Sequence, residues 1–401
     1  MEKAELTALL TPEGLRLLDA LPRVESSDDI ARVVTRLRRD GHSPDLVSAV
    51  VGQARLRTRA HAKFGDLAER MLFTRAGLEQ ATRLPIAARH AARFRDAGLA
   101  RVADLGCGIG GDALGLAALG MRVLAVDADE VTAGIAAYNL APFGDDVEVR
   151  HSTAEASDLS EVDAVWLDPA RRTAGHGETT RTRPEDWSPS LEWVFDLARR
   201  MPAGVKLGPG LDRDLIPEDV EAQWVSADGS TVELVLWSGA LAREGVRRAA
   251  LVIRGGGADA EARAYELTAG ADAADEPARE LGEYLHEPDG AVIRARLIGD
   301  VARTLQAGML DEHIAYLTSD APLTSPFVST FHVREVLPAD PKALSKALRE
   351  RDIGRLEIKK RGVDIDPATF RTKLKLRGSG AATLFVTRIG TRRTAILADR
   401  V

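Results

Sequence analysis

From residue 101 onward the sequence alternates short apolar runs with longer segments of helical periodicity. The first five runs have the length of buried strands: RVADLG, RVLAVD, VEVRHS, DAVWLD and GVKLGP. Strands that alternate with helices are typical of a parallel sheet with helices on both faces. Two further runs, 231–239 and 247–255, are separated by a short loop, which predicts a hairpin that adds one antiparallel strand. The pattern therefore predicts an α/β domain with a seven-stranded sheet.

The sequence before this domain has helical periodicity instead. Ser26 and the polar residues after it provide a helix cap, and apolar residues then recur at helical spacing: Ile30, Val33, Val34 and Leu37. Ser43-Pro44 begins a second helix, because proline fits the first helical position. We expect a helical N-terminal region over 1–80 and place the α/β domain at 81–257.

The C-terminal part of the chain has a different pattern. Residues 258–325 are rich in alanine and acidic residues and become helical around 291–310, which predicts a helical connector. Over 326–401, four apolar runs and two helical segments follow one another. Both helical segments open on an Asp-Pro pair, which is a helix-start signal. We expect a small α+β domain at 326–401.

Composition limits the class of protein. Of the 401 residues, 45% are hydrophobic and 29% are charged, as in a folded globular chain, and the apolar runs are too short to span a membrane. Residues 1–5 do not begin a signal peptide, since no apolar stretch follows them. The single cysteine, Cys107, excludes internal disulfides and cysteine-rich zinc sites, and the eight histidines have no metal-ligand spacing. We therefore expect a cytoplasmic protein without membrane or metal partners.

The charge is unevenly distributed along the chain, which carries −7 in total. Residues 326–401 contain 17 Lys and Arg against 8 Asp and Glu, and residues 32–95 contain 14 against 5. Two basic regions around an acidic middle favour a polyanionic partner, most simply a nucleic acid. Solvated arginine-rich helices are the plainer explanation of the same counts.

A glycine-rich loop follows the first predicted strand. Gly106, Gly108 and Gly111 satisfy G-x-G-x-x-G, a fingerprint of dinucleotide binding. Asp104 precedes these glycines, where its charge would repel a pyrophosphate but attract the sulfonium and α-ammonium groups of S-adenosylmethionine. Asp127 ends the next strand, in position to hold both hydroxyls of a ribose. The loop therefore favours S-adenosylmethionine over a nicotinamide cofactor; the alternative is a glycine turn that binds no ligand.

The segment Asp104–Asp112 resembles the first motif of class I S-adenosylmethionine-dependent methyltransferases. Its Cys-Gly-x-Gly-Gly core is most similar to the trimethylguanosine synthase branch. The similarity covers about residues 60–255 and includes VLAVDAD, Asn139 and VDAVWLDPARR. It implies a Rossmann-like methyltransferase sheet, methyl transfer, and S-adenosyl-L-methionine as the cofactor. Residues 326–401 resemble a THUMP-like domain, a small module associated with RNA-modifying enzymes.

The resemblance also implies a set of cofactor contacts. Asp127 should bind the ribose, and Ala128 should lie against the adenine. In the third motif, HSTAEAS, Thr153 stands at the position that is usually acidic, and we count Ala154, the next residue, among the cofactor-binding residues. Four residues should line the methionine end of the cofactor: Asp104, Gly106, Gly108 and Gly110. We include Cys107 among the cofactor-binding residues as a small residue of a crowded turn, and not as a nucleophile.

A second motif, DPARR, follows the fourth strand, at the edge where ligands of such sheets bind. In amino-methyltransferases, an Asp-Pro-Pro-aromatic turn at this place accepts hydrogen bonds from the target amine and stacks on the base. Asp168 and Pro169 keep this pattern, whereas Arg171 stands where the aromatic residue is usual. A guanidinium plane can stack on a base or bind a phosphate, so we predict these three residues as catalytic. Trp187 is either a further stacking surface or, more simply, a buried anchor.

Together these features predict an S-adenosylmethionine-dependent methyltransferase that modifies RNA, on a base amine or another base atom. Two alternatives remain open. One is a small-molecule methyltransferase whose basic regions serve another purpose, and the other is a non-catalytic RNA-binding protein that retains the fold. The altered Asp-Pro-Ala-Arg turn keeps the second alternative open.

Overall fold

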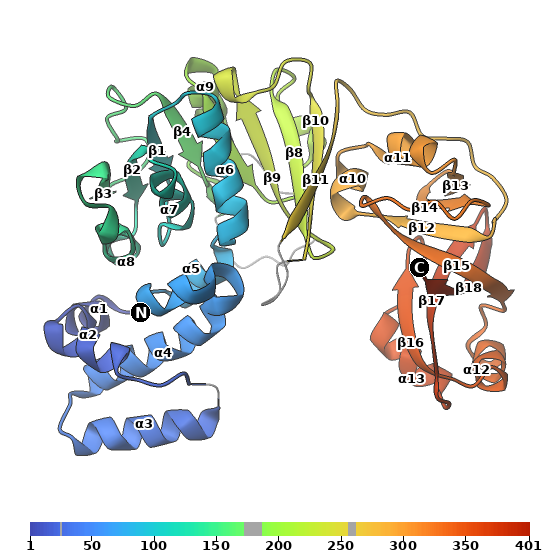
Figure 1. Cartoon of the computed structure of the whole chain (residues 1–401), viewed down its shortest axis with the longest axis horizontal. Helices are drawn as coiled ribbons and strands as arrows, with labels where there is room; N and C mark the ends of the chain where they lie inside the picture. The colour runs from blue at the N-terminus through green and yellow to red at the C-terminus, as the bar shows by residue number, and fades with distance from the viewer. Residues whose placement is uncertain (25, 172–186, 256–261) are drawn as a thin grey trace. The chain divides into compact units, whose positions relative to one another are not determined.

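Two compact units make up the chain, and the computed structural model describes residues 1–24, 26–171, 187–255 and 262–401 (Figure 1). The first unit consists of three segments: Met1–Leu207, Leu211–Val220 and Leu236–Arg243. The second unit consists of the other three: Gly208–Gly210, Glu221–Val235 and Glu244–Val401. Within the described ranges, no helix is both long enough and apolar enough to cross a membrane.

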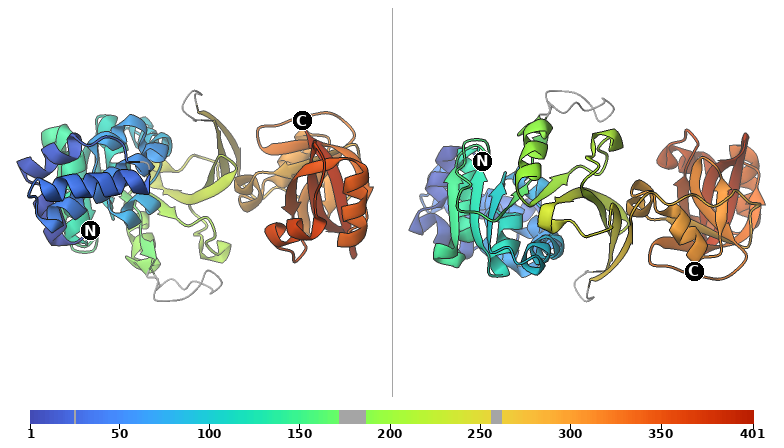
Figure 2. Two further views of the ribbon diagram at one scale, coloured as in Figure 1. Left: turned by 90° about the horizontal axis from the view of Figure 1, so that it is seen from below. Right: turned by 90° about the horizontal axis from the view of Figure 1, so that it is seen from above.

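Helices form the N-terminal part of the first unit: α1 (Lys3–Leu9), α2 (Pro12–Asp19), α3 (Ser27–Arg39), α4 (Pro44–Phe64), η1 (Gly65–Arg70), α5 (Arg75–Gln80) and α6 (Leu84–Asp96). Ser26 caps α3 and Ser43 caps α4, each through a side-chain oxygen that accepts a backbone N–H. Lys3 Nζ of α1 lies 2.5 Å from Glu130 Oε1 at the start of α8 (Glu130–Leu140). Figure 2 shows these N-terminal helices, in blue, beside the teal part of the same unit. The predicted helical N-terminal region is confirmed.

Five parallel strands form the centre of the first unit: β1 (Arg101–Leu105), β2 (Arg122–Asp127), β3 (Val147–His151), β4 (Ala164–Leu167) and β7 (Ala203–Leu207). Their order is β3-β2-β1-β4-β7, and Ala103 lies opposite both Leu124 and Val165. Helices α7 (Gly111–Ala118), α8 and α9 (Leu191–Arg200) alternate with the strands. A Cβ on Gly115 would lie 2.9 Å from the Ala87 carbonyl oxygen, so α7 can approach α6 closely only because glycine is present. The predicted α/β class is confirmed.

Within the described ranges the sheet contains nine strands instead of the predicted seven, in the order β11-β10-β8-β9-β7-β4-β1-β2-β3. The further strands are β8 (Glu221–Ala227), β9 (Ser230–Ser238), β10 (Arg248–Arg254) and β11 (Arg263–Ala269). The predicted hairpin between 231–239 and 247–255 is wrong, because β8 lies between β9 and β10. The tight turn is instead Asp228-Gly229, between β8 and β9, where φ is 52° and 79°. Two consecutive residues with positive φ are typical of the turns that close two-residue hairpins.

Strand β8 gives only a weak sequence signal, although all of its residues are buried. Three of those buried residues are polar: Glu221, Gln223 and Ser226. Polar residues break the apolar pattern by which a buried strand is found in a sequence. The strand is stabilised by its neighbours, since it pairs in parallel with β10, with Val225 opposite Leu251.

A second sheet, of seven strands in the order β13-β14-β12-β15-β18-β17-β16, lies in the second unit. Its strands are β12 (Tyr284–Pro288), β13 (Gly308–Asp311), β14 (Ile314–Ser319), β15 (Val328–Leu337), β16 (Ile353–Lys360), β17 (Gly380–Ile389) and β18 (Arg392–Arg400). Helices α12 (Pro341–Glu350) and α13 (Pro367–Leu374) are capped by Asp340 and Asp366, as the Asp-Pro pairs predict. Phe370 of α13 packs with Leu384 in one hydrophobic cluster, and Phe385, the next residue of β17, packs in another. The two helices therefore cover one face of this sheet.

Residues 258–325 are not helical throughout, although a helical connector was expected. Helices α10 (Gly290–Arg294) and α11 (Ile298–Thr304) lie where helix was predicted, but the same stretch also contains β11, β12, β13 and β14. β12 pairs with the distant β15, with Leu285 opposite Phe331. Strands that are stabilised by partners far along the chain leave little local signal. The second sheet thus begins before residue 326, and the other predicted domain boundaries stay predictions.

His286 of β12 is a buried titratable residue in the second sheet. Its ring nitrogens lie 3.0 Å from Thr330 Oγ1 and 2.9 Å from Ser319 Oγ. Burial lowers the pKa of His286 from 6.5 to about 4. The unfolded chain therefore binds a proton at pH values where the folded chain does not, so the free energy of unfolding decreases as the pH falls from about 6.5 to about 4.

We predict that His286→Gln makes the stability of the protein less dependent on pH. When the pH falls from 7 to 5, the wild type should lose about 2 kcal/mol more unfolding free energy than the variant, because only the histidine gains a proton on unfolding. Urea unfolding of both proteins at the two pH values measures this difference. Equal losses in the two proteins would contradict the prediction.

Candidate functional site

The glycine loop joins β1 to α7 and adopts a conformation that requires glycine. Gly106, Gly108 and Gly110 have φ values of 92°, 56° and 87°, in the left-handed region. A Cβ on Gly106 would also lie 2.9 Å from the Asp168 carbonyl oxygen. The Gly106 amide donates to the Val126 carbonyl at 2.9 Å. The loop is therefore fixed to the end of β2 and lies against the turn that follows β4.

This loop lines a pocket of about 550 Å³ at the carboxyl ends of the parallel strands, a volume that suits a nucleotide-sized ligand. The pocket brings together most of the predicted site residues: Gly106, Cys107, Gly108, Asp127, Ala128, Ala154, Asp168 and Pro169. Thr153 and Glu155 of the third motif also line it. Thr82, before α6, and Lys206 of β7 line it as well, and the sequence analysis did not identify either of them.

Asp104 and Gly110 do not line the pocket, although they belong to the glycine motif. Asp104 is 1% exposed, and within the described ranges neither of its carboxylate oxygens accepts a hydrogen bond. Burial and the neighbouring carboxylates of Asp112 and Asp168 raise the pKa of Asp104 well above its ordinary value. Gly110 caps α7, and a Cβ there would lie 3.1 Å from Leu140 Cδ1. Their assignment as cofactor-binding residues stays a prediction.

Asp127 holds the glycine loop from the end of β2. Its Oδ2 accepts from the Gly108 amide at 3.0 Å, and its Oδ1 accepts from the Asp129 amide at 2.9 Å. Burial raises the pKa of Asp127, and these hydrogen bonds partly offset the shift. Burial, with the carboxylates of Asp104 and Asp127, also raises the pKa of the Cys107 thiol well above its usual range. The thiol is therefore protonated at neutral pH, which disfavours a nucleophilic role.

Lys206 contributes the positive charge that the sequence analysis missed. Its Nζ lies 2.5 Å from Asp168 Oδ2 and 3.8 Å from Asp112 Oδ2. It also donates to Thr82 Oγ1 at 3.0 Å, and its side chain is only 12% exposed. Lys206 thus holds together the turn after β4, the first turn of α7 and the loop before α6. A lysine within the apolar run GVKLGP was the signal available in the sequence.

Asp112 is the second carboxylate of this cluster. Burial opposes its charge, but Lys206 and the hydrogen bonds from His90 and Thr82 outweigh burial and lower the pKa of Asp112 to about 2. Thr82 Oγ1 donates to Asp112 Oδ2 at 2.7 Å, and His90 Nδ1 lies 2.9 Å from Asp112 Oδ1. The His90 ring also packs against Trp166 of β4, with 4.4 Å between the ring centroids and the ring planes tilted by 31°. Asp112 is therefore ionised and helps to balance the charge of Lys206.

The turn after β4 continues into a short strand pair, β5 (Ala170–Arg171) and β6 (Trp187–Ser188), in which Arg171 lies opposite Trp187. Pro169 and Ala170 line the pocket. Trp187 is 6% exposed, which favours the buried anchor over the stacking surface. The side chain of Arg171 and the whole of Arg172 lie outside the described residues. A catalytic role for Arg171 stays a prediction.

A relative from Mycobacterium tuberculosis (strain H37Rv) shows the family of this chain. The relative is named "Uncharacterized S-adenosylmethionine-dependent methyltransferase" and is 34% identical over 363 residues, which cover 88% of this chain and 95% of the relative. The corresponding protein of strain CDC 1551 matches to the same extent. The chain belongs to the S-adenosylmethionine-dependent methyltransferases. S-adenosylmethionine is therefore the cofactor of this methyltransferase, as the glycine loop predicted.

The fold of the methyltransferase is similar to a crystal structure described as a "putative methyltransferase" from Porphyromonas gingivalis W83. The two share 20% identity with a TM-score of 0.68, over 94% of this chain and 99% of the other. Two family models also match: THUMP domain-like at residues 328–400 and a domain of unknown function (DUF8688) at residues 2–60. The first of these matches confirms the THUMP-like resemblance of the C-terminal region.

The pocket of the methyltransferase fits the chemistry of S-adenosylmethionine. The cofactor carries a sulfonium and an α-ammonium group; Asp104, directly before the glycine loop, is an acidic residue but does not line the pocket. Asp127 supplies a partly buried carboxylate at the place where an acid holds a ribose. Asp127 and the glycine loop would hold the cofactor, which supplies an electrophilic methyl group when bound. Among the described residues, no three His, Cys, Asp or Glu side chains are grouped to hold a metal ion.

We predict that Asp127→Ala weakens S-adenosylmethionine binding by about 1 to 3 kcal/mol, because it removes hydrogen bonds to a charged acceptor and releases the Gly108 amide. Isothermal titration calorimetry measures the change in affinity. Asp158→Ala is the matched control, since Asp158 is an exposed carboxylate that does not line the pocket. Equal affinities of the wild type and Asp127→Ala for S-adenosylmethionine would reject the assignment of Asp127 as a cofactor-binding residue.

Proposed function

We propose that this methyltransferase transfers a methyl group to an amine of a base in RNA, with Asp168 as the residue that orients the amine. The observation that carries the proposal is the position of the Asp168-Pro169 turn. It lines the cofactor pocket, and its backbone comes so close to the glycine loop that a Cβ on Gly106 does not fit between them. A nucleophile bound at this turn lies beside the end of the pocket at which the methionine part of the cofactor is expected.

Methyl transfer is a displacement in which the nitrogen attacks the methyl carbon in line with the leaving sulfur, so orientation of the nitrogen provides much of the rate. A carboxylate that accepts a hydrogen bond from the amine directs its lone pair toward the methyl group. Lys206, 2.5 Å from Asp168 Oδ2, fixes the position of that carboxylate. Arg171 stands where an aromatic residue usually stacks on the base, so binding of the base depends on other residues.

An RNA substrate is supported by the THUMP-like match at 328–400, a module associated with RNA-modifying enzymes, and by the positive charge of the same region. Not all of its basic residues are available for RNA. Lys359 lies 2.6 Å from Glu287 and 3.3 Å from Glu357, so its charge is already balanced. The Arg361 guanidinium lies over the Tyr316 ring and donates to a backbone carbonyl.

Five exposed basic residues of this region follow one another closely along the chain, one at the end of β16 and four on or just after α13: Lys360, Arg371, Lys373, Lys375 and Arg377. None of them forms an ion pair in the described part of the chain. Exposed, unpaired cations that follow one another along a short segment can contact successive phosphates of a strand. We therefore assign RNA docking to these residues.

We predict that Asp168→Asn lowers the rate of methyl transfer by at least about tenfold while S-adenosylmethionine affinity stays close to that of the wild type, because orientation matters most at the transition state. Methyl transfer to RNA from cells that lack the gene is the assay, with mass spectrometry of the modified nucleosides to identify the product. Melting temperatures of both proteins provide the control for folding. A destabilised but fully active variant would show that Asp168 only stabilises the fold.

We further predict that the double variant Lys373→Gln, Lys375→Gln binds RNA more weakly than the wild type. The slope of the logarithm of the association constant against the logarithm of the salt concentration should become shallower by about 1 to 2, because two phosphate contacts are lost. Fluorescence anisotropy with a labelled RNA at several salt concentrations measures both quantities. Arg122→Gln is the control, since it removes an exposed charge at the start of β2. An unchanged slope in the double variant would count against docking by α13.

A further inference from the structure

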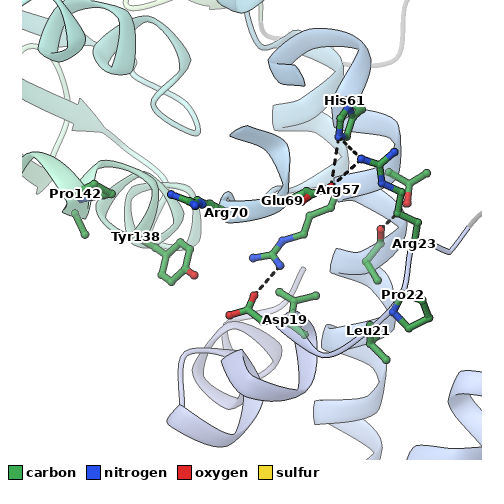
Figure 3. A pocket seen from close by; sticks show the side chains of 14 residues that line it. Asp19, Leu21, Pro22, Arg23, Arg57, His61, Glu69, Arg70, Tyr138 and Pro142 are labelled. Carbon is green, nitrogen blue, oxygen red and sulfur yellow. Dashed lines mark hydrogen bonds and ion pairs between the residues drawn. The ribbon is translucent and has the colours of Figure 1, made fainter. Parts of the chain in front are cut away.

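A second pocket, of about 860 Å³, lies in the first unit between the N-terminal helices and α8 (Figure 3). It is lined from α2, α4, η1 and α8 and from the chain that follows α2 and α8. Among the residues that the structure describes, it shares no lining residue with the cofactor pocket. Much of its wall comes from residues 18–58, within the match to a domain of unknown function.

Arg57 of α4 is the buried cation of this pocket. It is 8% exposed; its Nε donates to the Met71 carbonyl at 3.0 Å, and its Nη1 donates to Asp19 Oδ1 at 2.9 Å. Its Nη2 has no hydrogen-bond partner in the described part of the chain. Figure 3 shows the guanidinium group next to Asp19, with Tyr138 farther away on α8. A buried donor without an acceptor is costly, and an anionic group in the pocket would satisfy it.

The remaining charges leave the pocket positive. Arg23 lies 2.8 Å from Glu69 Oε1, and its Nη2 is also 2.8 Å from His61 Nε2. Glu69 thus balances Arg23, and Asp19 balances Arg57. Arg70 is exposed at the wall of the pocket and forms no ion pair among the described residues. Its charge therefore favours an anionic ligand.

Tyr138 of α8 provides a flat surface on the opposite side of the pocket (Figure 3). It is half-buried, and apolar residues complete the lining: Leu18, Leu21, Pro22, Ala54, Ala141 and Pro142. An aromatic ring next to arginines is the combination by which proteins bind single-stranded RNA, because bases stack on the ring and phosphates pair with the guanidinium groups.

We propose that this pocket binds a nucleotide of the RNA substrate, with its phosphate at Arg57 and Arg70 and its base against Tyr138. The inference rests on the proposed RNA methylation and adds to it a subsite remote from the Asp168 turn. Such a subsite compensates for the missing aromatic residue after Asp168, because it supplies stacking elsewhere on the strand.

The pocket is joined to the cofactor loop by a short series of hydrogen bonds. Arg57 holds the Met71 carbonyl, and the next residue, Leu72, exchanges two hydrogen bonds with the Asn139 side chain, at 2.7 and 3.0 Å. Asn139 also donates to the Ile109 carbonyl, in the glycine loop, at 2.9 Å. A nucleotide bound at Arg57 is therefore held by the same framework that shapes the cofactor site.

The test uses two single variants of the full chain, Tyr138→Leu and Arg70→Gln. Arg57 is not replaced, because it donates a hydrogen bond to the Met71 carbonyl and its loss would disturb the fold. A fluorescein-labelled single-stranded oligoribonucleotide is titrated and its anisotropy is followed. Each variant should bind it at least about fivefold more weakly than the wild type, in keeping with the loss of one stacking or phosphate contact. S-adenosylmethionine affinity should be unchanged in both, and Arg122→Gln should bind the RNA as the wild type does.

The outcomes separate this inference from the proposed function. Wild-type RNA affinity in both pocket variants, with RNA methylation intact, would overturn the subsite and leave the proposed function standing. A wild type that neither binds nor methylates RNA would overturn both. Calorimetry with adenosine 5′-monophosphate distinguishes the source of the nucleotide, since tight binding that Tyr138→Leu abolishes, without RNA binding, would assign the pocket to a free nucleotide and reject the RNA subsite.

Discussion

The positive charge of Lys206 holds together a cluster of carboxylates that would otherwise repel one another. Asp104, Asp112 and Asp168 interact electrostatically, and the pKa of Asp104 is raised by burial and by the other two. Lys206 contacts Asp168 and lies 3.8 Å from Asp112. Removing one partner of a buried ion pair leaves an uncompensated charge and costs about 3 to 5 kcal/mol. The turn after β4, the start of α7 and the loop before α6 therefore depend on this one side chain for their positions at the pocket.

The glycine loop adds a steric constraint to this electrostatic one. At Gly106 the chain needs a positive φ, and it also needs room for the Asp168 carbonyl, which a Cβ would approach to 2.9 Å. Both requirements exclude other residues. The consequence is functional, because the turn proposed to bind the amine lies against the loop expected to hold the methyl donor. A methyltransferase needs these two sites close together, and here the backbone itself brings them together.

The proposed contacts with the substrate are spread more widely along the chain than the proposed catalytic residues. In the second unit, the exposed cations of α13 are suited to phosphates, whereas Lys359 and Arg361 are engaged within the fold. In the first unit, the N-terminal helices form a pocket with α8 that combines Arg57, Arg70 and Tyr138. Weak contacts spread over several places can hold a long polyanion without a strong contact at the reacting base. This arrangement suits an enzyme whose Asp-Pro turn lacks the usual aromatic residue.

The sequence by itself determined the features whose physical basis is local. Apolar periodicity predicted the parallel strands and the N-terminal helices, the Asp-Pro pairs predicted the starts of α12 and α13, and the glycine spacing predicted the cofactor loop. Each of these depends on residues a few positions apart, so a short stretch of sequence contains the whole signal.

Only the tertiary structure decided the features that depend on distant residues. Lys206 meets Asp112 and Thr82 across more than 90 positions, and Arg57 and Tyr138, about 80 positions apart, line the same pocket. Strand β8, with its buried polar residues, is stabilised by its neighbours in the sheet, and β12 by β15. Long-range ion pairs, shared pockets and strand pairing leave no periodic pattern in the sequence, because the partners are brought together only when the chain has folded.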